Sequence, residues 1–380
     1  MSLFGVVISR HYDDTAGTLT TRLKVLLAGN DEATARELTD SLTPSGWEII
    51  QARDAVSATA AMLRSRPDAV VLFGDLPGGG AVLVLRRLRA SVHTAMTPVI
   101  AISGRREGDA EALRAHGVDE CMPFPADPHA IRAWIQNRLA TPNVGVQAPA
   151  TVLRDVDRTS ALVRSGLLDS PAEESFDTLT QLASSLLGIP VSLVSLVDTD
   201  RQFFKSQVGL GEPWAAMRET PLTHSFCQWV VSSHDELFVA DARTHQLLSH
   251  NQAIADLGVV AYGGVPLTST SGEPLGSLCA IDTAPRVWSE ASIALLRHLA
   301  QVAEACIAIS ENEAAKKQPA LDAEQQGIAR SLVLRALGAG VAQCTQLLQR
   351  GDLRLTPAEQ LALLKLAERF GQHIVLVAGA

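Results

Sequence analysis

The residues of this chain that could do chemistry are few, and the cysteines come first. There are five of them: Cys121, Cys227, Cys279, Cys306 and Cys344. Their odd number, wide spacing and lack of a CxxC pair predict neither a disulfide framework nor a zinc site. Past residue 320 we find no histidine phosphoacceptor motif, no glycine-rich nucleotide site and no cyclase-like motif. We therefore expect a protein that is not an enzyme and has no metal site and no identified cofactor.

Length, composition and charge narrow the class of protein further. The 380 residues suffice for two or three domains, and 47% hydrophobic with 19% charged residues is typical of a folded globular chain. A net charge of -9 without a clustered basic face argues against nucleic-acid binding as the main function. Residues 1–9 lack a basic leading segment, and no apolar run reaches the ~18 residues that span a bilayer. We expect a cytoplasmic protein without a membrane segment.

Residues 23–140 alternate short β-branched or apolar runs with longer amphipathic stretches. We expect strands at 24–28, 47–52, 69–73, 98–103 and 120–122, and helices at 32–42, 55–65, 81–90, 109–116 and 128–139. This βαβ rhythm predicts a doubly wound α/β domain with a five-stranded parallel sheet. We expect residues 141–150, which mix Pro, Asn, Gly and Gln, to form a linker, and residues 1–22 an N-terminal extension.

Four landmarks in register give residues 23–140 a resemblance to the flavodoxin-like receiver domains of response regulators. They are Arg66-Pro67-Asp68 before the third strand, Leu76-Pro77-Gly78 after it, Gly117-Val118-Asp119 before the fifth strand and Pro125 after it. The resemblance implies an Asp at the end of the third strand that accepts a phosphoryl group beside Mg²⁺. It also implies an acidic pair after the first strand, a Ser or Thr on the fourth and a Lys on the fifth.

Most of these positions hold residues that cannot do phosphotransfer chemistry. The acceptor position is Phe73, which has no oxygen to attack phosphorus or coordinate Mg²⁺. The acidic pair is Gly29 and Asn30, the Lys position is Phe124, and Ser103 keeps the hydroxyl. The resemblance is thus to a pseudo-receiver, in which we expect both aromatic rings to fill the site and the domain to dock or dimerise. The alternative is that both rings are ordinary core residues of an unrelated βα domain.

Residues 151–316 are expected to form an α+β domain with an antiparallel sheet. We expect strands at 191–198, 202–207, 237–240, 262–267 and 274–281. Helices are expected at 151–165, at 225–231, at 289–316 and after a cap-like opening at Asp169-Ser170-Pro171. Several ordered blocks resemble the bacterial sensory GAF domain, among them Ser225-Phe226-Cys227, Val239-Ala240-Asp241-Ala242 and Leu275-Gly276-Ser277-Leu278-Cys279.

The GAF resemblance implies a pocket between one face of the sheet and the helices and loops that cover it. The candidates for its wall are Arg218, His224, Phe226, Cys227, Trp229, Tyr262 and Cys279. For the aromatic rings the alternative is core packing, for the guanidinium a surface salt bridge, and for the cysteines an inert buried thiol. The ligand is unknown, because no His follows either cysteine, as is usual for bilin attachment, and Asn251-Gln252 does not complete a cyclic-nucleotide pattern.

The helices at 151–165 and 289–316 flank the GAF-like region where such modules dimerise in parallel. An a/d-like stripe predicts a homodimer through these helices, with a solvated structural helix as the alternative: Leu295, Leu299, Val302 and Ile309. Residues 320–380 are expected to be all helical, with helices at 323–349 and 356–375. The opening of the second resembles a helix-turn-helix output domain, but no recognition helix follows.

Together these features predict a signal-transduction regulator of the two-component type. In it, a phosphorylation-incompetent receiver and a GAF sensor relay small-molecule or partner binding to another protein. The expected partners are a second copy of the chain and a signalling protein such as a histidine kinase or an output protein. Two alternatives remain: a GAF-fold thiol redox enzyme that uses Cys227 and Cys279, and a response-regulator-like DNA-binding protein with a degenerate output domain.

Overall fold

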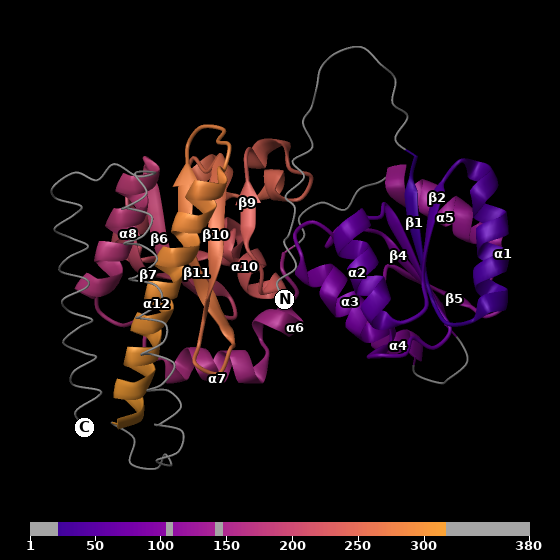
Figure 1. The fold of residues 1–380 in the computed structure, drawn as a ribbon, viewed down its shortest axis with the longest axis horizontal. Coiled ribbons are helices and arrows are strands. Elements are labelled where there is room, and N and C mark those ends of the chain that lie inside the picture. The colour runs from indigo at the N-terminus through magenta and orange to yellow at the C-terminus, as the bar shows by residue number, and fades with distance from the viewer. Residues whose placement is uncertain (1–21, 104–108, 141–146, 317–380) are drawn as a thin grey trace.

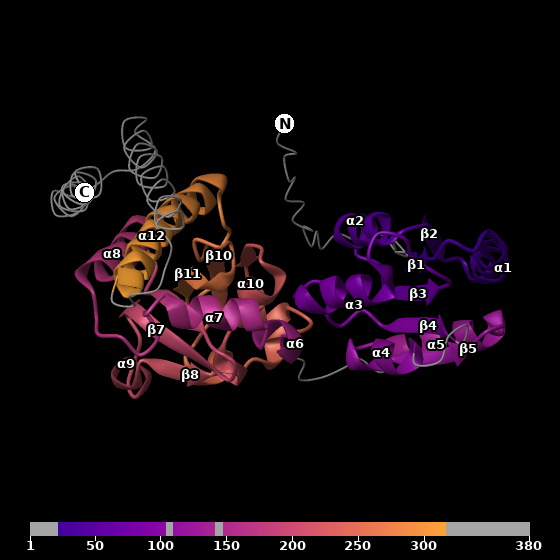
Figure 2. The same cartoon turned by 90° about the horizontal axis from the view of Figure 1, so that it is seen from below.

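The computed structural model describes residues 22–103, 109–140 and 147–316, which form two domains lying side by side (Figure 1). Each domain is built on its own β-sheet. The turned view shows that helix α3 (Gly80–Ala90) of the first domain faces the second domain (Figure 2). Cys344 and the predicted helices at 320–380 lie outside the described residues, as does most of the predicted N-terminal extension.

The first domain contains five parallel strands: β1 (Lys24–Ala28), β2 (Glu48–Ala52), β3 (Ala69–Phe73), β4 (Val99–Ser103) and β5 (Glu120–Pro123). Their order in the sheet is β2-β1-β3-β4-β5, which confirms the predicted doubly wound fold. The central strand β3 is buried along its whole length, as expected for a parallel strand covered on both faces.

Helices cover both faces of this sheet: α1 (Glu32–Leu42), η1 (Thr43–Ser45), α2 (Ala55–Ser65), α3, α4 (Asp109–Ala115) and α5 (Pro128–Ala140). Successive strand residues point to opposite faces. Leu26 and Leu72 therefore pack under α2, α3 and α4, whereas Val25 and Phe73 pack under α1 and α5. This alternation explains why nearly every residue of the inner strands is apolar.

Two short helices, α6 (Ala150–Leu153) and α7 (Val156–Arg164), lead into the second domain where the sequence predicts one long helix. That prediction is wrong because the carboxylate of Asp155 caps α7 by accepting two backbone N–H groups of its first turn. The buried Arg158 side chain then donates to the carbonyl of Leu153 at 3.0 Å, which fixes the bend between the helices.

The second domain contains six antiparallel strands: β6 (Val191–Val197), β7 (Arg201–Val208), β8 (Glu219–Pro221), β9 (Leu237–Val239), β10 (Ala261–Thr268) and β11 (Pro274–Asp282). Their order is β8-β7-β6-β11-β10-β9, which confirms the predicted antiparallel sheet. The edge strand β8 is the one strand among these that the sequence did not predict, since its three residues are too few to show an alternating pattern.

Helices pack on both faces of the second sheet. One face lies against α8 (Glu174–Leu187) and α12 (Glu290–Lys316), and the other against α10 (Cys227–Ser233). α8 does not begin at the predicted opening near Asp169, because Ser170 and Pro171 instead accept hydrogen bonds from the buried Lys205 ammonium. The remaining short helices are α9 (Trp214–Met217), η2 (Leu222–His224), η3 (Ala242–Thr244), η4 (Leu248–His250) and α11 (Ala253–Asp256).

The apolar stripe of α12 belongs to the core of its own domain. Leu295, Leu299 and Val302 are no more than 3% exposed and pack with α8 and the sheet, and Ile309 packs against the same cluster. The prediction that this stripe forms a dimer interface is therefore wrong, because its side chains are already covered within one chain. The helix segment Glu290–Ala315 is long and apolar enough to cross a membrane, but 61% of its most apolar 18-residue stretch is buried in the domain, as in a core helix.

Candidate functional site

Gly29 and Phe73 lie against each other at the carboxyl edge of the first sheet. Phe73 ends β3 and is 3% exposed, and Gly29 directly follows β1. A Cβ atom on Gly29 would lie 2.2 Å from the Phe73 carbonyl oxygen and 2.5 Å from Cδ2 of its ring. Two positions that carry carboxylates in a receiver are thus occupied by a ring and by the one residue type that fits beside it.

The carboxylates nearest to this edge do not replace those that are missing. Asp31 caps α1 by accepting from the N–H groups of Ala33 and Thr34, at 3.1 and 3.2 Å. Asp75 is exposed, and the positive φ of Gly74 turns the chain before it. Nowhere in the described ranges do three or more His, Cys, Asp or Glu side chains gather in a way that could hold a metal ion. These residues therefore do not fit the magnesium ion of a receiver, which needs a cluster of oxygen ligands.

Ser103 and Phe124 lie at the same edge of the sheet, on β4 and just after β5. The Ser103 carbonyl accepts a hydrogen bond from the Phe124 N–H at 3.0 Å. The Phe124 side chain is 45% exposed, so the expectation that both phenylalanine rings fill the site holds for Phe73 alone. The reason is that β5 is the edge strand, where a residue beyond its end has solvent on one side.

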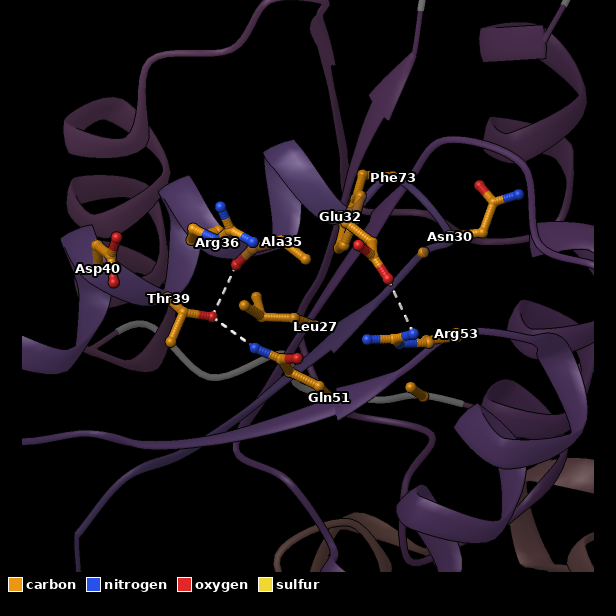
Figure 3. Close-up of a pocket in the computed structure, with 12 residues that line it drawn as sticks. Leu27, Asn30, Glu32, Ala35, Arg36, Thr39, Asp40, Gln51, Arg53 and Phe73 are labelled. Carbon is orange, nitrogen blue, oxygen red and sulfur yellow. Dashed lines mark hydrogen bonds and ion pairs between the residues drawn. The ribbon is translucent and has the colours of Figure 1, made fainter.

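A cavity of about 220 Å³ opens next to this edge, between α1 and the ends of β1 and β2 (Figure 3). Four charged side chains line it, and two of them, Glu32 and Arg53, form an ion pair at 3.0 Å. Figure 3 shows the amide of Asn30 directed away from this pair, while Thr39 and Gln51 share a hydrogen bond of 2.8 Å. The carboxylates of this lining come from α1, and the position at the end of β3 that accepts the phosphoryl group in a receiver is Phe73.

Four of the seven predicted pocket residues line a pocket of the second domain, between the sheet and α10: His224, Phe226, Cys227 and Tyr262. The space left in this pocket is about 20 Å³, enough for about one water molecule. The rings of Phe226 and Tyr262 stack with their centroids 5.2 Å apart and occupy the interior. The pocket is closed in this conformation, so any larger ligand requires its wall to move.

The other three predicted residues are not part of this lining. Trp229 is 2% exposed and packs in the core beside α10, and Cys279 lies next to Cys227. Arg218 donates to two backbone carbonyl oxygens, at 3.0 and 3.1 Å, and its guanidinium lies over the ring of Phe203. Arg218 therefore braces the loop beside β7 and makes neither the expected surface salt bridge nor a pocket wall.

The thiols of Cys227 and Cys279 are neighbours, with their Sγ atoms 3.9 Å apart. This separation is well beyond the ~2.0 Å of a disulfide bond, so both are free thiols. Burial raises the pKa of Cys279. Burial also opposes ionisation of Cys227, but its hydrogen bonds with Cys279, Ser277 and Tyr262 outweigh burial and lower the pKa of Cys227 to about 7. The pKa values of the two thiols are thus shifted in opposite directions, and both thiols are buried.

His224 lines the pocket and contacts the segments beside it. Its Nε2 lies 2.9 Å from Oδ2 of Asp256 on α11, and its Nδ1 lies 3.0 Å from the hydroxyl of Thr223. The ring of Trp214 packs beside it, with centroids 5.1 Å apart. These contacts connect η2 to α11 across the pocket, so His224 holds the covering segment in place.

A third cavity, of about 410 Å³, lies where the two domains meet. Its walls come from the residues just before β1, β3 and β4 and from residues 245–247 of the second domain. The ionisable residues in these walls are Arg22, Lys24, Arg66, Asp68, His93 and His245. Sequence reasoning missed this group because its members come from four separate segments. The signal that was present is a basic residue shortly before each of the strands β1 and β3.

Comparison with known proteins supports the description of both domains. The profile of the GAF domain family matches residues 171–307. A cyclic di-GMP phosphodiesterase of Pseudomonas aeruginosa is 34% identical over 144 residues, which are 37% of this chain and 24% of the relative. The phosphate regulon transcriptional regulatory protein PhoB of the same organism is 28% identical over 115 residues, 30% of this chain and 50% of the relative. The chain thus spans about a quarter and a half of these two relatives.

A solved structure of the receiver domain of a Pseudomonas aeruginosa sensor histidine kinase, with magnesium in its active-site cleft, also matches. It is 20% identical, with a TM-score of 0.30, and the match covers 32% of this chain and 99% of that chain. Residues 171–307 are therefore a GAF domain, and the region in front of them resembles the receiver domains of response regulators, an architecture that fits a signal-transduction regulator.

Proposed function

We propose that this protein is a cytoplasmic signalling regulator without catalytic activity, in which the GAF domain takes the input and the receiver-like domain docks onto a partner. A histidine kinase or an output protein is the kind of partner we expect. The observation that carries the proposal is the fit between Gly29 and Phe73, which leaves no carboxylate at the acceptor or metal positions. A signal that cannot enter by phosphotransfer must enter elsewhere, and the GAF pocket is the candidate.

The pocket has a wall that could respond to a ligand. Leu257 and Val259 in this wall directly follow residues 248–256, which hold η4 and α11, and polar contacts tie that segment to the rest of the domain. These include the pair of His224 with Asp256, and a hydrogen bond of 3.1 Å from the Asn251 amide to the Ser225 carbonyl. Because residues 248–256 connect this wall to residues 245–247, which face the first domain, we expect opening of the pocket to shift the surface between the domains.

The first test asks whether the receiver-like domain accepts a phosphoryl group. The full chain is incubated with acetyl phosphate and Mg²⁺ and its peptides are analysed by mass spectrometry, with an intact receiver domain treated in parallel. We expect no phosphorylated Asp in the wild type. We also expect none in Phe73→Asp, since Gly29 and Asn30 supply no metal ligands. A phosphorylated Asp between residues 22 and 140 of the wild type would overturn the proposal.

The second test asks whether the GAF pocket controls partner binding. Leu210→Trp places a large ring in the pocket wall, whereas Leu63→Trp places the same ring on a 62% exposed position of α2. We expect the first substitution, and not the second, to change the set of proteins that crosslink to the chain in cells. Equal crosslinking by both variants and the wild type would count against a sensor role.

A thiol redox activity is the second candidate, because the Sγ atoms of Cys227 and Cys279 lie 3.9 Å apart. The remaining space of about 20 Å³ leaves no room for a substrate beside Cys227 in this conformation, and we therefore place this candidate second. Disulfide or sulfoxide reduction that persists in a variant with both cysteines changed to Ser would rule it out. The phosphodiesterase activity of the relative is not assigned to this chain, which spans 24% of it.

A further inference from the structure

We infer that the cavity between the two domains is a binding site for a phosphate-bearing small molecule. It lies at the amino edge of the first sheet, opposite the edge at which Phe73 replaces the phosphoacceptor. Its volume of about 410 Å³ is within the range of about 300–1,000 Å³ found for small-molecule sites. This site is separate from the GAF pocket and does not depend on the function proposed for it.

The cavity concentrates positive charge that the rest of the structure leaves uncompensated. The side chains of Arg22, Lys24 and Arg66 make no hydrogen bond or ion pair with another described residue. Asp68 is the single acid in the lining, and its Oδ2 already accepts the backbone N–H of Lys24 at 2.8 Å. Three cations around one cavity are unusual in a chain of net charge -9, and a polyanion would neutralise them.

Two imidazole rings complete the walls, one from each domain. His93 and His245 face each other with their centroids 6.1 Å apart. The Nδ1 atom of His245 accepts the N–H groups of Leu247 and Leu248, both at 3.2 Å, so the proton of the neutral ring is on Nε2. His245 therefore presents an N–H donor, and an anion between the rings would be held by both domains at once.

Arg66 also affects the protonation of the two imidazole rings. Desolvation and the cation of Arg66 lower the pKa of His245, and the same two causes with His245 itself lower the pKa of His93 to about 4. Both rings are therefore neutral at pH 7 without an anion. An anion would favour their protonation, so its binding should tighten as the pH falls.

The first-domain wall is held rigid by groups that are not themselves part of the cavity. Arg89 on α3 donates to the carbonyls of Ala95 and Thr97, at 2.8 and 2.7 Å, and pairs with Asp119 at 2.7 Å. These bonds tie the part of the loop that follows His93 back to α3. On the other side of this loop, Val92 and Ala95 pack into the apolar core of the second domain. The cavity is a preformed feature of the domain contact.

The test uses the full chain and inorganic pyrophosphate, followed by isothermal titration calorimetry. We expect one site per chain, and a loss of affinity of about tenfold or more in Arg66→Gln, the size expected for one charge-assisted contact. The matched control is Arg64→Gln, which removes an exposed guanidinium outside the lining from the last turn of α2, the helix that Arg66 follows. Binding that is absent in the wild type, or equally weakened in both variants, would overturn the inference.

A second variant tests the part that the GAF domain plays. His245→Asn keeps an acceptor near the Nδ1 position for the loop but removes the Nε2–H donor. We expect it to weaken pyrophosphate binding about fivefold with an unchanged melting temperature, and to reduce the gain in affinity between pH 7.5 and pH 5.5. Unchanged binding in this variant would show that the anion is held by the first domain alone and would refute a site between the domains. Parallel titrations with inorganic phosphate and with a nucleoside diphosphate distinguish the sources of the phosphate group.

Discussion

The two edges of the parallel sheet in the first domain differ in a way that reverses the usual distribution of function in this fold. At the carboxyl edge, where ligands of doubly wound sheets bind, Phe73 and Gly29 pack together, and Glu32 and Arg53 beside them form an ion pair. At the amino edge, Arg22, Lys24 and Arg66 surround a larger cavity, and their side chains have no hydrogen-bond or ion-pair partner within the described ranges. The first edge has become part of the core, and the second has gained the chemistry that could hold a ligand.

This difference indicates that the departure from the receiver pattern at the carboxyl edge is not a single substitution. A carboxylate at position 73 would still lack a metal-binding side chain at position 29, which is glycine. A carboxylate at position 29 would place its Cβ against the Phe73 carbonyl. The carboxyl edge is therefore locked in one state. The amino edge faces the GAF domain, so it is the edge that a GAF signal can reach.

The largest expected effect comes from emptying the carboxyl edge. Phe73→Ala removes a 3% exposed ring from the cluster that α1 and α5 form on the sheet. We expect it to lower the free energy of unfolding by about 3–5 kcal/mol, measured by urea denaturation. The matched control Phe124→Ala acts on a 45% exposed ring and should cost less than about 1 kcal/mol. Equal effects would show that the edge is not a packed core.

The same edge allows a test of the contact between the two residues. Gly29→Ala should cost about 1–3 kcal/mol in the wild type, because its Cβ meets both the ring and the carbonyl of Phe73. In the Phe73→Ala background the cost should be smaller, since the ring contact is gone while the carbonyl remains. Strict additivity of the two changes would contradict the proposed fit.

The next effect in size concerns the amino edge. Arg89→Met leaves the carbonyls of Ala95 and Thr97 without their donor and removes one of the partners of Asp119. We expect a loss of about 2–3 kcal/mol in the free energy of unfolding and weaker pyrophosphate binding. Arg87→Met on the same helix, at an exposed position, is the control and should change neither quantity. If Arg89→Met lowers stability by the full amount but leaves pyrophosphate binding normal, the contacts of Arg89 with the loop do not shape the cavity.

The strands and most helices could be predicted from the sequence, but the difference between the two edges of the first sheet could not. The strands could be predicted because each is a short run of apolar residues between turn signals, and the position of Phe73 followed from the landmarks around β3. The contact between Phe73 and Gly29 could not be predicted, because it depends on the relative positions of the ends of β1 and β3 in the folded sheet. The basic cavity needs residues as far apart as Arg22 and His245. The stripe of α12 was misassigned because an apolar helix face looks alike whether its own domain or a second chain covers it.

A smaller effect is expected from pH. The pKa of His93 is lowered from 6.5 to about 4, so the unfolded chain takes up the proton first as the pH falls. The contribution of His93 to the free energy of unfolding is therefore fully present above about pH 6.5 and is lost as the pH falls towards 4. One side of His93 is exposed, so we expect a decline of about 1 kcal/mol, well below the full shift. His93→Gln should flatten this dependence in urea titrations, and pyrophosphate should also reduce it by favouring the protonated ring.

The smallest expected effect returns to the charges of the carboxyl edge. Glu32→Gln removes an ion pair with Arg53 whose side chains are 67% and 73% exposed, and should change stability by no more than about 0.5 kcal/mol, less at high salt. It should leave pyrophosphate binding unchanged, because the pair lies at the opposite end of the sheet from the cavity between the domains. Arg66→Gln changes one charge in the same way but is expected to lower the affinity about tenfold with little effect on stability. If Glu32→Gln alters binding as strongly as Arg66→Gln, the anion responds to the net charge of the domain, and the distinction between its two edges fails.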